Sequence, residues 1–163
     1  MGWHCMRKGI ADLHRRAAVS QAANERYLEA LASVEDTTSV GELASRLCRP
    51  ITRNGRRTRA LNPYAHHEAR LLDAVSPGEF TINGFRNRDL RLRLFNDSGA
   101  SKQEQRRHAA AVTRKLALLR AHRLIRKVPG THRYHLSRHG RLIVTALIAA
   151  RNADANALTK LAA

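Results

Sequence analysis

Two segments of the chain carry most of the information about its architecture: residues 112–128, VTRKLALLRAHRLIRKV, and residues 134–141, YHLSRHGR. In the first segment, Val112, Leu116 and Leu119 recur at spacings of three and four residues, which predicts one buried face of an α-helix. That helix is expected to end near His122, since the apolar residues that follow no longer keep the helical period. The first segment therefore predicts a helix that ends near His122 and is followed by a non-helical element.

The residues after this helix predict a β-hairpin and a final helix. Residues 125–128 and 133–136 are two short runs of β-compatible residues, and the Pro-Gly-Thr-His sequence of residues 129–132 separates them. Ser137 is a suitable N-cap for a last helix that extends to about Arg151. The tail beyond that helix is expected to fray.

The residues before the helix predict further elements of the same unit. Helical periodicity is expected over residues 66–75 and again over residues 85–95, and residues 79–82 between them are expected to form a short extended segment. Ser101 and Glu104 have the spacing of a capping box. The helix that follows this capping box should therefore begin at about residue 102.

The first 62 residues predict a helical extension. A long helix is expected over residues 4–34, and a short helix over residues 40–47 is expected to be capped by Thr38 or Ser39. The Asn54-Gly55 pair between β-compatible residues is typical of a two-residue turn, so it predicts a hairpin over residues 51–59. The expected division has three parts: an N-terminal extension with this hairpin over residues 1–62, a main domain over residues 65–151, and a frayed tail over residues 152–163.

The predicted order of helix, short extended segment, helix, helix, hairpin and helix resembles a winged helix-turn-helix DNA-binding domain. Residues 112–128 look like the recognition helix and first wing strand of MarR-type bacterial regulators. Residues 134–141 resemble their second wing strand and the Leu-Thr-x-x-Gly-Arg start of their final helix. Arg123 is a departure, because the family usually has glycine where the recognition helix closes. The resemblance implies an α+β fold, mainly helical with small β-hairpins, and a transcriptional regulator.

Other stretches resemble the C-terminal region of longer uncharacterised bacterial proteins, which are labelled MarR-like because of that end. These stretches are residues 6–16, 24–28 and 84–90. This second resemblance implies that the chain is a truncated or degenerate copy of a larger protein.

The charge of the chain indicates a polyanionic partner. Its 163 residues include 30 Lys and Arg against 13 Asp and Glu, a formal net charge of +17. Such a balance favours double-stranded DNA over a small metabolic substrate, and an anionic membrane surface is the weaker alternative. The sequence contains no apolar run of membrane-spanning length and no secretory signal, and Cys5 and Cys48 are too few for a disulfide framework. A cytoplasmic, nucleoid-associated protein is expected.

The expected DNA-binding face lies opposite the buried stripe of the helix over residues 102–122. At 100° per residue, Arg107, Ala110 and Arg114 project away from the core, and Arg106 and Thr113 lie on one flank. Arginine can donate two hydrogen bonds to guanine, alanine allows close approach, and threonine can meet a thymine methyl group. Backbone or minor-groove contacts are expected from the preceding helix and from the hairpin, namely from Arg86, Arg88, Arg91, Arg93, Arg126, Lys127, His132 and Arg133.

Each of these charged groups also has a simpler interpretation. A basic helix face can merely be solvated, and the arginines of the 51–59 hairpin fit an accessory wing or a solvated ribbon equally well. The whole chain also fits a second hypothesis, in which it is a non-specific nucleic-acid-binding module derived from a larger mobile-element or plasmid protein.

No catalytic, metal or cofactor site is predicted. His132, His135 and His139 form an H-x2-H-x3-H run, but no cysteine pair stands near them to complete a zinc site. The chain has no G-x-S-x-G motif and no phosphate-binding glycine loop, and Asp154 is the only acidic residue after Glu104. The chain is therefore expected not to be an enzyme. A homodimer is the oligomer that the sequence suggests, with the first and last helices packed across a two-fold axis.

Overall fold

The computed structural model describes residues 13–31, 38–53 and 55–154. These residues belong to two compact units, divided after residue 33. Several predicted features lie outside the described residues: both ends of the long N-terminal helix, Cys5, Asn54 and the tail from residue 155.

The first unit is the helix α1 (Leu13–Leu31), which lies within the helix predicted over residues 4–34. Its apolar side chains Leu13, Val19 and Leu28 are all more than 60% exposed. The helix is therefore confirmed over the described residues, and these three apolar side chains are exposed.

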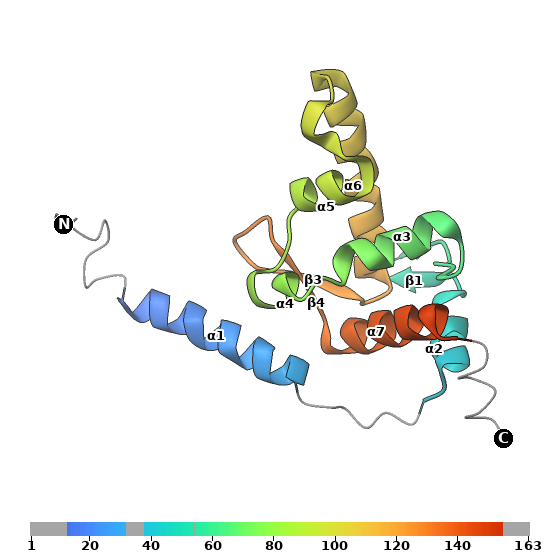
Figure 1. The fold of residues 1–163 in the computed structure, drawn as a ribbon, viewed down its shortest axis with the longest axis horizontal. Helices are drawn as coiled ribbons and strands as arrows, with labels where there is room; N and C mark the ends of the chain where they lie inside the picture. The colour runs from blue at the N-terminus through green and yellow to red at the C-terminus, as the bar shows by residue number, and fades with distance from the viewer. Residues whose placement is uncertain (1–12, 32–37, 54, 155–163) are drawn as a thin grey trace. The chain divides into compact units, whose positions relative to one another are not determined.

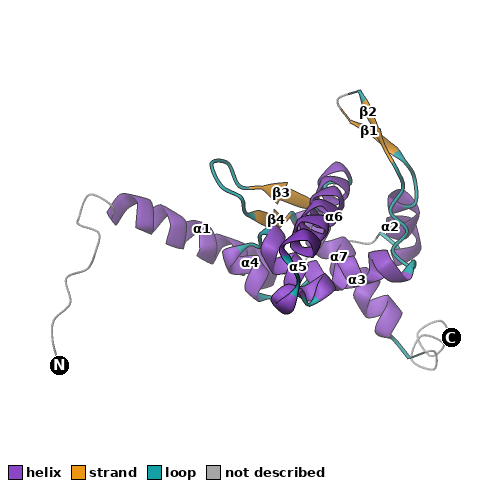
Figure 2. Cartoon of the chain, turned by 90° about the horizontal axis from the view of Figure 1, so that it is seen from above, coloured by secondary structure: helices purple, strands orange, loops and turns teal. Residues whose placement is uncertain are grey.

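The second unit contains the remaining helices and two β-hairpins (Figures 1 and 2). In chain order the elements are α2 (Val40–Leu47), β1 (Ile51–Arg53), β2 (Arg56–Thr58), α3 (His66–Val75), α4 (Glu79–Asn83), α5 (Asn87–Phe95), a 3₁₀ turn (Asp97–Gly99), α6 (Lys102–Ala121), β3 (Ile125–Lys127), β4 (Tyr134–Leu136) and α7 (Arg138–Asn152). Both sheets have two antiparallel strands. The α+β class, mainly helical with small hairpins, is confirmed.

Local capping signals place the helix ends where the sequence predicts them. Ser101 and Glu104 form the expected capping box at the start of α6. The Ser137 hydroxyl accepts a hydrogen bond from the Gly140 N–H at 2.8 Å at the start of α7. Arg123 follows the end of α6 with φ of +58°, so it occupies the left-handed conformation that glycine normally provides.

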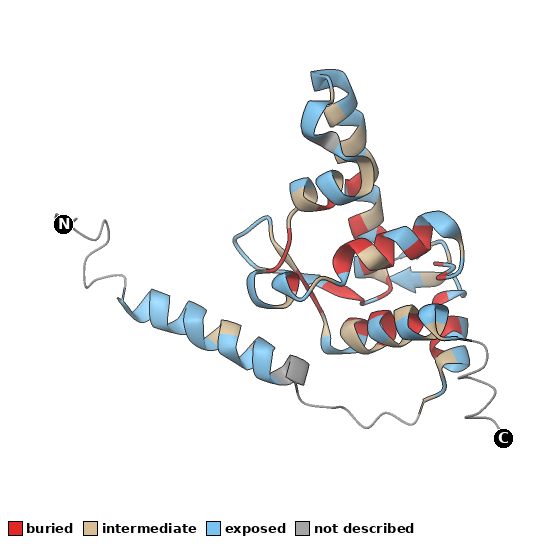
Figure 3. Cartoon of the chain, viewed as in Figure 1, coloured by how far each residue is buried: buried red, intermediate tan, exposed pale blue. Residues whose placement is uncertain are grey.

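The core of the second unit lies between α6, α3, α7 and α2 (Figure 3). The predicted stripe of α6 is buried, with Val112 and Leu119 at 0% exposure and Leu116 at 3%. It packs with apolar residues from all these helices and from the turns, including Leu43, Leu47, Leu71, Leu72, Val75, Phe85, Leu90, Leu124, Ile143, Val144 and Leu147. None of residues 102–111 is buried, so the N-terminal half of α6 extends beyond this core.

The prediction of an extended segment over residues 79–82 is wrong. These residues form the short helix α4, in which the Thr81 N–H donates to the Gly78 carbonyl at 2.9 Å. Phe80 is buried and packs against Phe85, with 5.2 Å between the ring centroids. Burial of this aromatic side chain overrides the β preference of the Phe-Thr-Ile sequence. The extended residue is instead Phe85, which forms an isolated bridge with Tyr134.

The expected boundary near residue 62 differs from the observed division after residue 33. The sequence places α2 in the N-terminal extension, whereas Leu43, Ala44 and Leu47 are buried in the same core as residues of α6 and α7. An eight-residue helix is too short to be stable alone, so its apolar face is buried against the larger unit. The β1–β2 hairpin, confirmed as a hairpin, also belongs to the second unit.

Candidate nucleic-acid interface

The helix α6 carries a continuous exposed face on the side opposite its buried stripe. Arg106, Arg107, Ala110, Thr113 and Arg114 are all exposed. The side chains of Arg106, Arg107 and Arg114 have no hydrogen-bond or ion-pair partner among the described residues. The guanidinium groups are therefore available to an external ligand.

The charge around this face is almost entirely positive. Residues 102–136 contain ten Lys and Arg residues and one acidic residue, Glu104, whose carboxylate accepts a hydrogen bond from the Ser101 N–H at 2.9 Å. Burial lowers the pKa of Lys115, which lies on the flank of α6 nearer the core. An anion that approaches α6 therefore meets a strongly positive surface.

Contacts between α5 and α6 hold the exposed half of α6 in place. The Asn87 amide donates to the Ala109 carbonyl at 3.0 Å and to the Thr113 hydroxyl at 3.1 Å. The Phe95 ring stacks on His108, with 4.2 Å between centroids and an interplanar angle of 2°. These contacts hold α5 against the N-terminal half of α6. They also engage the Thr113 hydroxyl within the protein, which the prediction of a base-contacting threonine did not anticipate.

The four arginines predicted on α5 and at its start have different environments. Arg88 is exposed and lies 3.4 Å from the Asp89 carboxylate, and Arg86 is half-buried at the N-cap position. Arg91 donates to the Gln105 carbonyl at 3.1 Å, which ties α5 to the first turns of α6. Arg93 pairs with Glu79 at 2.8 Å and lies over the Phe80 ring. Arg88 is thus the member of this group most exposed for a phosphate contact.

The β3–β4 hairpin is the predicted wing, with Ile125 opposite Leu136 and Lys127 opposite Tyr134. Arg126, Lys127 and His132 are exposed. Arg133 is half-buried instead, and its guanidinium donates to the Asn83 carbonyl at 2.8 Å. That hydrogen bond links the β3–β4 hairpin to the last residue of α4. Arg133 therefore helps to hold the hairpin in place, and its guanidinium does not project freely into solvent.

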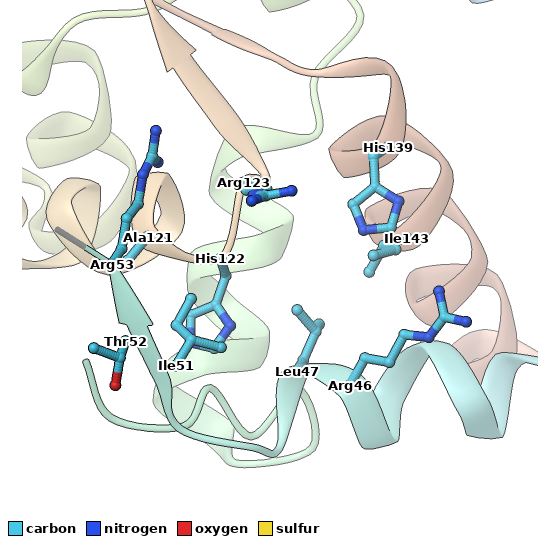
Figure 4. A pocket seen from close by; sticks show the side chains of 10 residues that line it. All are labelled: Arg46, Leu47, Ile51, Thr52, Arg53, Ala121, His122, Arg123, His139 and Ile143. Atoms are coloured by element: carbon cyan, nitrogen blue, oxygen red, sulfur yellow. The ribbon is translucent and has the colours of Figure 1, made fainter. Parts of the chain in front are cut away.

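The β1–β2 hairpin lies beside the C-terminal end of α6, a placement that the sequence did not predict. The Arg53 guanidinium donates to the Arg120 carbonyl at 3.0 Å, and the His122 ring Nε2 lies 3.0 Å from the Arg59 carbonyl. In Figure 4, β1 and the end of α6 border a pocket of about 270 Å³ that also meets α2 and α7. Its lining includes Arg46, Leu47, Arg123, His139 and Ile143. The hairpin is therefore attached to the end of α6 at two points, Arg53 next to its turn and Arg59 just after β2.

Two further observations concern metal binding and membrane crossing. Among the described side chains, no three His, Cys, Asp or Glu residues gather as a group that could hold a metal ion. In the same residue ranges, no helix combines the length and the hydropathy needed to cross a bilayer.

Comparison of the chain with protein-family models, with curated proteins and with solved structures finds no match. Any functional conclusion must therefore come from the geometry and charge of the second unit.

Proposed function

We propose that the chain is a double-stranded-DNA-binding protein of the winged helix-turn-helix type, and that it acts as a MarR-like transcriptional regulator in the cytoplasm. The observation that carries this proposal is the exposed face of α6. It presents Arg106, Arg107 and Arg114, which have no partner among the described residues, while Val112, Leu116 and Leu119 of the same helix are buried in the core. The resemblance of residues 112–128 and 134–141 to MarR-type regulators supports the same function.

The dimensions of α6 suit the major groove. The helix has 20 residues and is therefore about 30 Å long, and the groove is about 12 Å wide, which admits one α-helix. Arg107 and Arg114 are seven residues apart, or about 10 Å along the axis, close to the rise of three base pairs. The intervening Ala110 is small enough to let the helix approach the base edges. Arginine at both positions favours guanine, because its guanidinium can bond O6 and N7 together.

Residues outside α6 would supply affinity more than sequence choice. Four exposed side chains outside α6 are suited to contacts with phosphate oxygens. They are Arg88 on α5 and Arg126, Lys127 and His132 on the β3–β4 hairpin. If six to eight phosphates are contacted, the logarithm of the association constant should fall against the logarithm of salt concentration with a slope of roughly −5 to −7. A slope shallower than about −2 would argue against DNA binding.

The test is selection of binding sites from a pool of random DNA duplexes with the full chain. A wild-type chain should enrich a consensus, and the double variant Arg107→Ala/Arg114→Ala should enrich none. Its thermal unfolding should match the wild type, since neither side chain is buried or hydrogen-bonded. The variant Arg15→Ala/Arg16→Ala removes the same charge from the exposed surface of α1 and should keep the consensus.

The selection also tests the second hypothesis, a module that binds nucleic acid through charge alone. The observation that favours it is the wide spread of basic residues, since exposed arginines occur on α1 and the β1–β2 hairpin as well as on α6. Tight, salt-dependent binding without any enriched consensus would support this hypothesis and reject sequence-specific regulation.

A further inference from the structure

A groove of about 460 Å³ runs between the β1–β2 hairpin and the C-terminal half of α6. It is lined by three arginines and by small or hydroxyl-bearing residues, namely Arg53, Arg56, Arg120, Thr58, Ala117 and Ala121. Among the described residues, no carboxylate lines it. A groove with this lining is suited to an anion.

The strand register places two of these arginines directly opposite each other. Arg53 pairs with Arg56 across the hairpin, while Thr52 pairs with Arg57. Successive side chains of a strand point to opposite faces, so Arg56 and Arg57 lie on different faces of the ribbon. Like charges directly opposite each other destabilise an antiparallel pair. An anion in the groove would offset that repulsion.

The hairpin is held where the two arginines face α6. Arg53 bonds the Arg120 carbonyl, His122 bonds the Arg59 carbonyl, and the Arg59 guanidinium pairs with the buried Glu68 carboxylate. The Arg56 and Arg120 side chains have no partner among the described residues. A hairpin attached to α6 at Arg53 and Arg59, beside the unpaired Arg56 and Arg120 side chains, differs from a solvated ribbon, which would need no such attachment.

The groove lies beside the C-terminal half of α6, to one side of the line of Arg107 and Arg114. At 100° per residue, Ala117 is turned about 60° and Arg120 about 120° around the helix from Arg114, and both line the groove with the β1–β2 hairpin. In Figure 2 the two hairpins flank α6, with β3–β4 on one side and β1–β2 on the other. A duplex seated on α6 would therefore have one of its backbones next to each hairpin.

We propose that the β1–β2 hairpin is a second wing, and that its groove with α6 binds a phosphodiester backbone of the same duplex. This inference rests on the proposed function, because it takes DNA as the partner. The Arg56 and Arg120 guanidiniums bind phosphate oxygens from the two walls of the groove. Ala117 and Ala121 leave room for the backbone to approach. The contact adds affinity without sequence choice.

The test measures the affinity of the full chain for a fluorescently labelled duplex of mixed sequence at several salt concentrations. The variant Arg56→Ala should weaken binding about eightfold at 0.1 M salt and make the salt slope shallower by about 0.9, the value of one phosphate contact. Arg56→Ala/Arg120→Ala should lose about twice that slope. Arg57→Ala is the matched control, because it removes the same charge from the next residue on the other face of the ribbon, and it should lose less than half as much.

Equal effects of Arg56→Ala and Arg57→Ala would overturn the second wing, since only overall charge would then matter. Unchanged binding in Arg56→Ala would overturn it as well. Neither result bears on DNA binding through α6, which is tested separately by the loss of the consensus in Arg107→Ala/Arg114→Ala. Failure of the wild-type chain to bind any duplex would refute both DNA binding through α6 and the second wing. Circular dichroism melting of Arg56→Ala should show a Tm equal to or slightly above that of the wild type, because the side chain is exposed, has no partner among the described residues and faces the like charge of Arg53.

Discussion

Replacement of Gly140 by alanine should destabilise the protein, although alanine is normally favoured over glycine within a helix by about 1 kcal/mol. A Cβ atom at Gly140 would lie 1.9 Å from the Leu124 carbonyl oxygen and 2.6 Å from its carbonyl carbon. Non-bonded atoms attract at about 3.5 Å, so α7 would have to move by roughly 1.5 Å. The contact is with backbone, which cannot rotate away as a flexible side chain can.

The expected cost follows from the contacts that this movement disturbs. Overpacking of a dense core costs about 1–3 kcal/mol, and loss of the Ser137 cap costs about 1 kcal/mol more. After the helix propensity of alanine is subtracted, the net loss is about 1–3 kcal/mol. For a unit of this size it corresponds to a fall of roughly 5–10 °C in Tm.

Thermal and urea unfolding, followed by circular dichroism, measure this effect. Gly41→Ala is the matched control, since Gly41 also lies in the first turn of a helix but its nearest heavy atom is the Ser39 hydroxyl oxygen at 4.0 Å. That variant should be as stable as the wild type or up to about 1 kcal/mol more stable. If Gly140→Ala were as stable as Gly41→Ala, the close packing of α7 on Leu124 would be refuted.

Three other substitutions test separate features. Glu68→Ala should cost about 1–3 kcal/mol, measured by urea unfolding, because the buried carboxylate accepts hydrogen bonds from the Asn62 N–H and from the Arg59 guanidinium, whose side chain is exposed to solvent. A change below about 1 kcal/mol would contradict that role. Arg123→Gly should raise the unfolding free energy by about 1 kcal/mol, because it relieves the left-handed backbone at φ of +58°, and an equal or lower Tm would show that the arginine side chain compensates for the strain. Burial lowers the pKa of Lys115 below its ordinary 10.5, so the folded state holds the proton less tightly than the unfolded state. The cost of burying the charged Lys115 is therefore present in full below the pKa of the folded state and disappears as the pH rises towards 10.5. Lys115→Met should raise Tm at pH 7, and this gain should shrink at alkaline pH. A gain in Tm that does not depend on pH would contradict the burial of a charged lysine.

Much of the second unit follows from local signals. The Ser101–Glu104 capping box, the Ser137 cap and the 3.6-residue period of Val112, Leu116 and Leu119 are properties of neighbouring residues, and the structure has each of them where the sequence predicts it. The same period places Arg107 and Arg114 on the exposed side of α6. Continuing it to Ala117 and Arg120 would also have found the helix side of the groove.

The errors and omissions involve contacts that the local sequence pattern does not encode. Residues 79–82 include the β-compatible side chains Phe80, Thr81 and Ile82, yet the segment is helical and Phe80 is buried against Phe85. Asn87 reaches 22 residues forward to the Ala109 carbonyl, and Arg53 reaches 67 residues forward to the Arg120 carbonyl. Neither pairing leaves a pattern in the local sequence.

The amino-acid sequence alone determined the positive charge of the chain, the order of its elements and the direction of the basic face of α6, because composition, caps and periodicity act over a few residues. Tertiary structure decided that α2 shares the core of α6, that α5 orients the protruding half of α6, and that the β1–β2 hairpin lies against its other end. Such arrangements depend on which apolar faces pack together and which polar groups hydrogen-bond between elements far apart in the sequence. Those contacts form only when the elements pack around a common core.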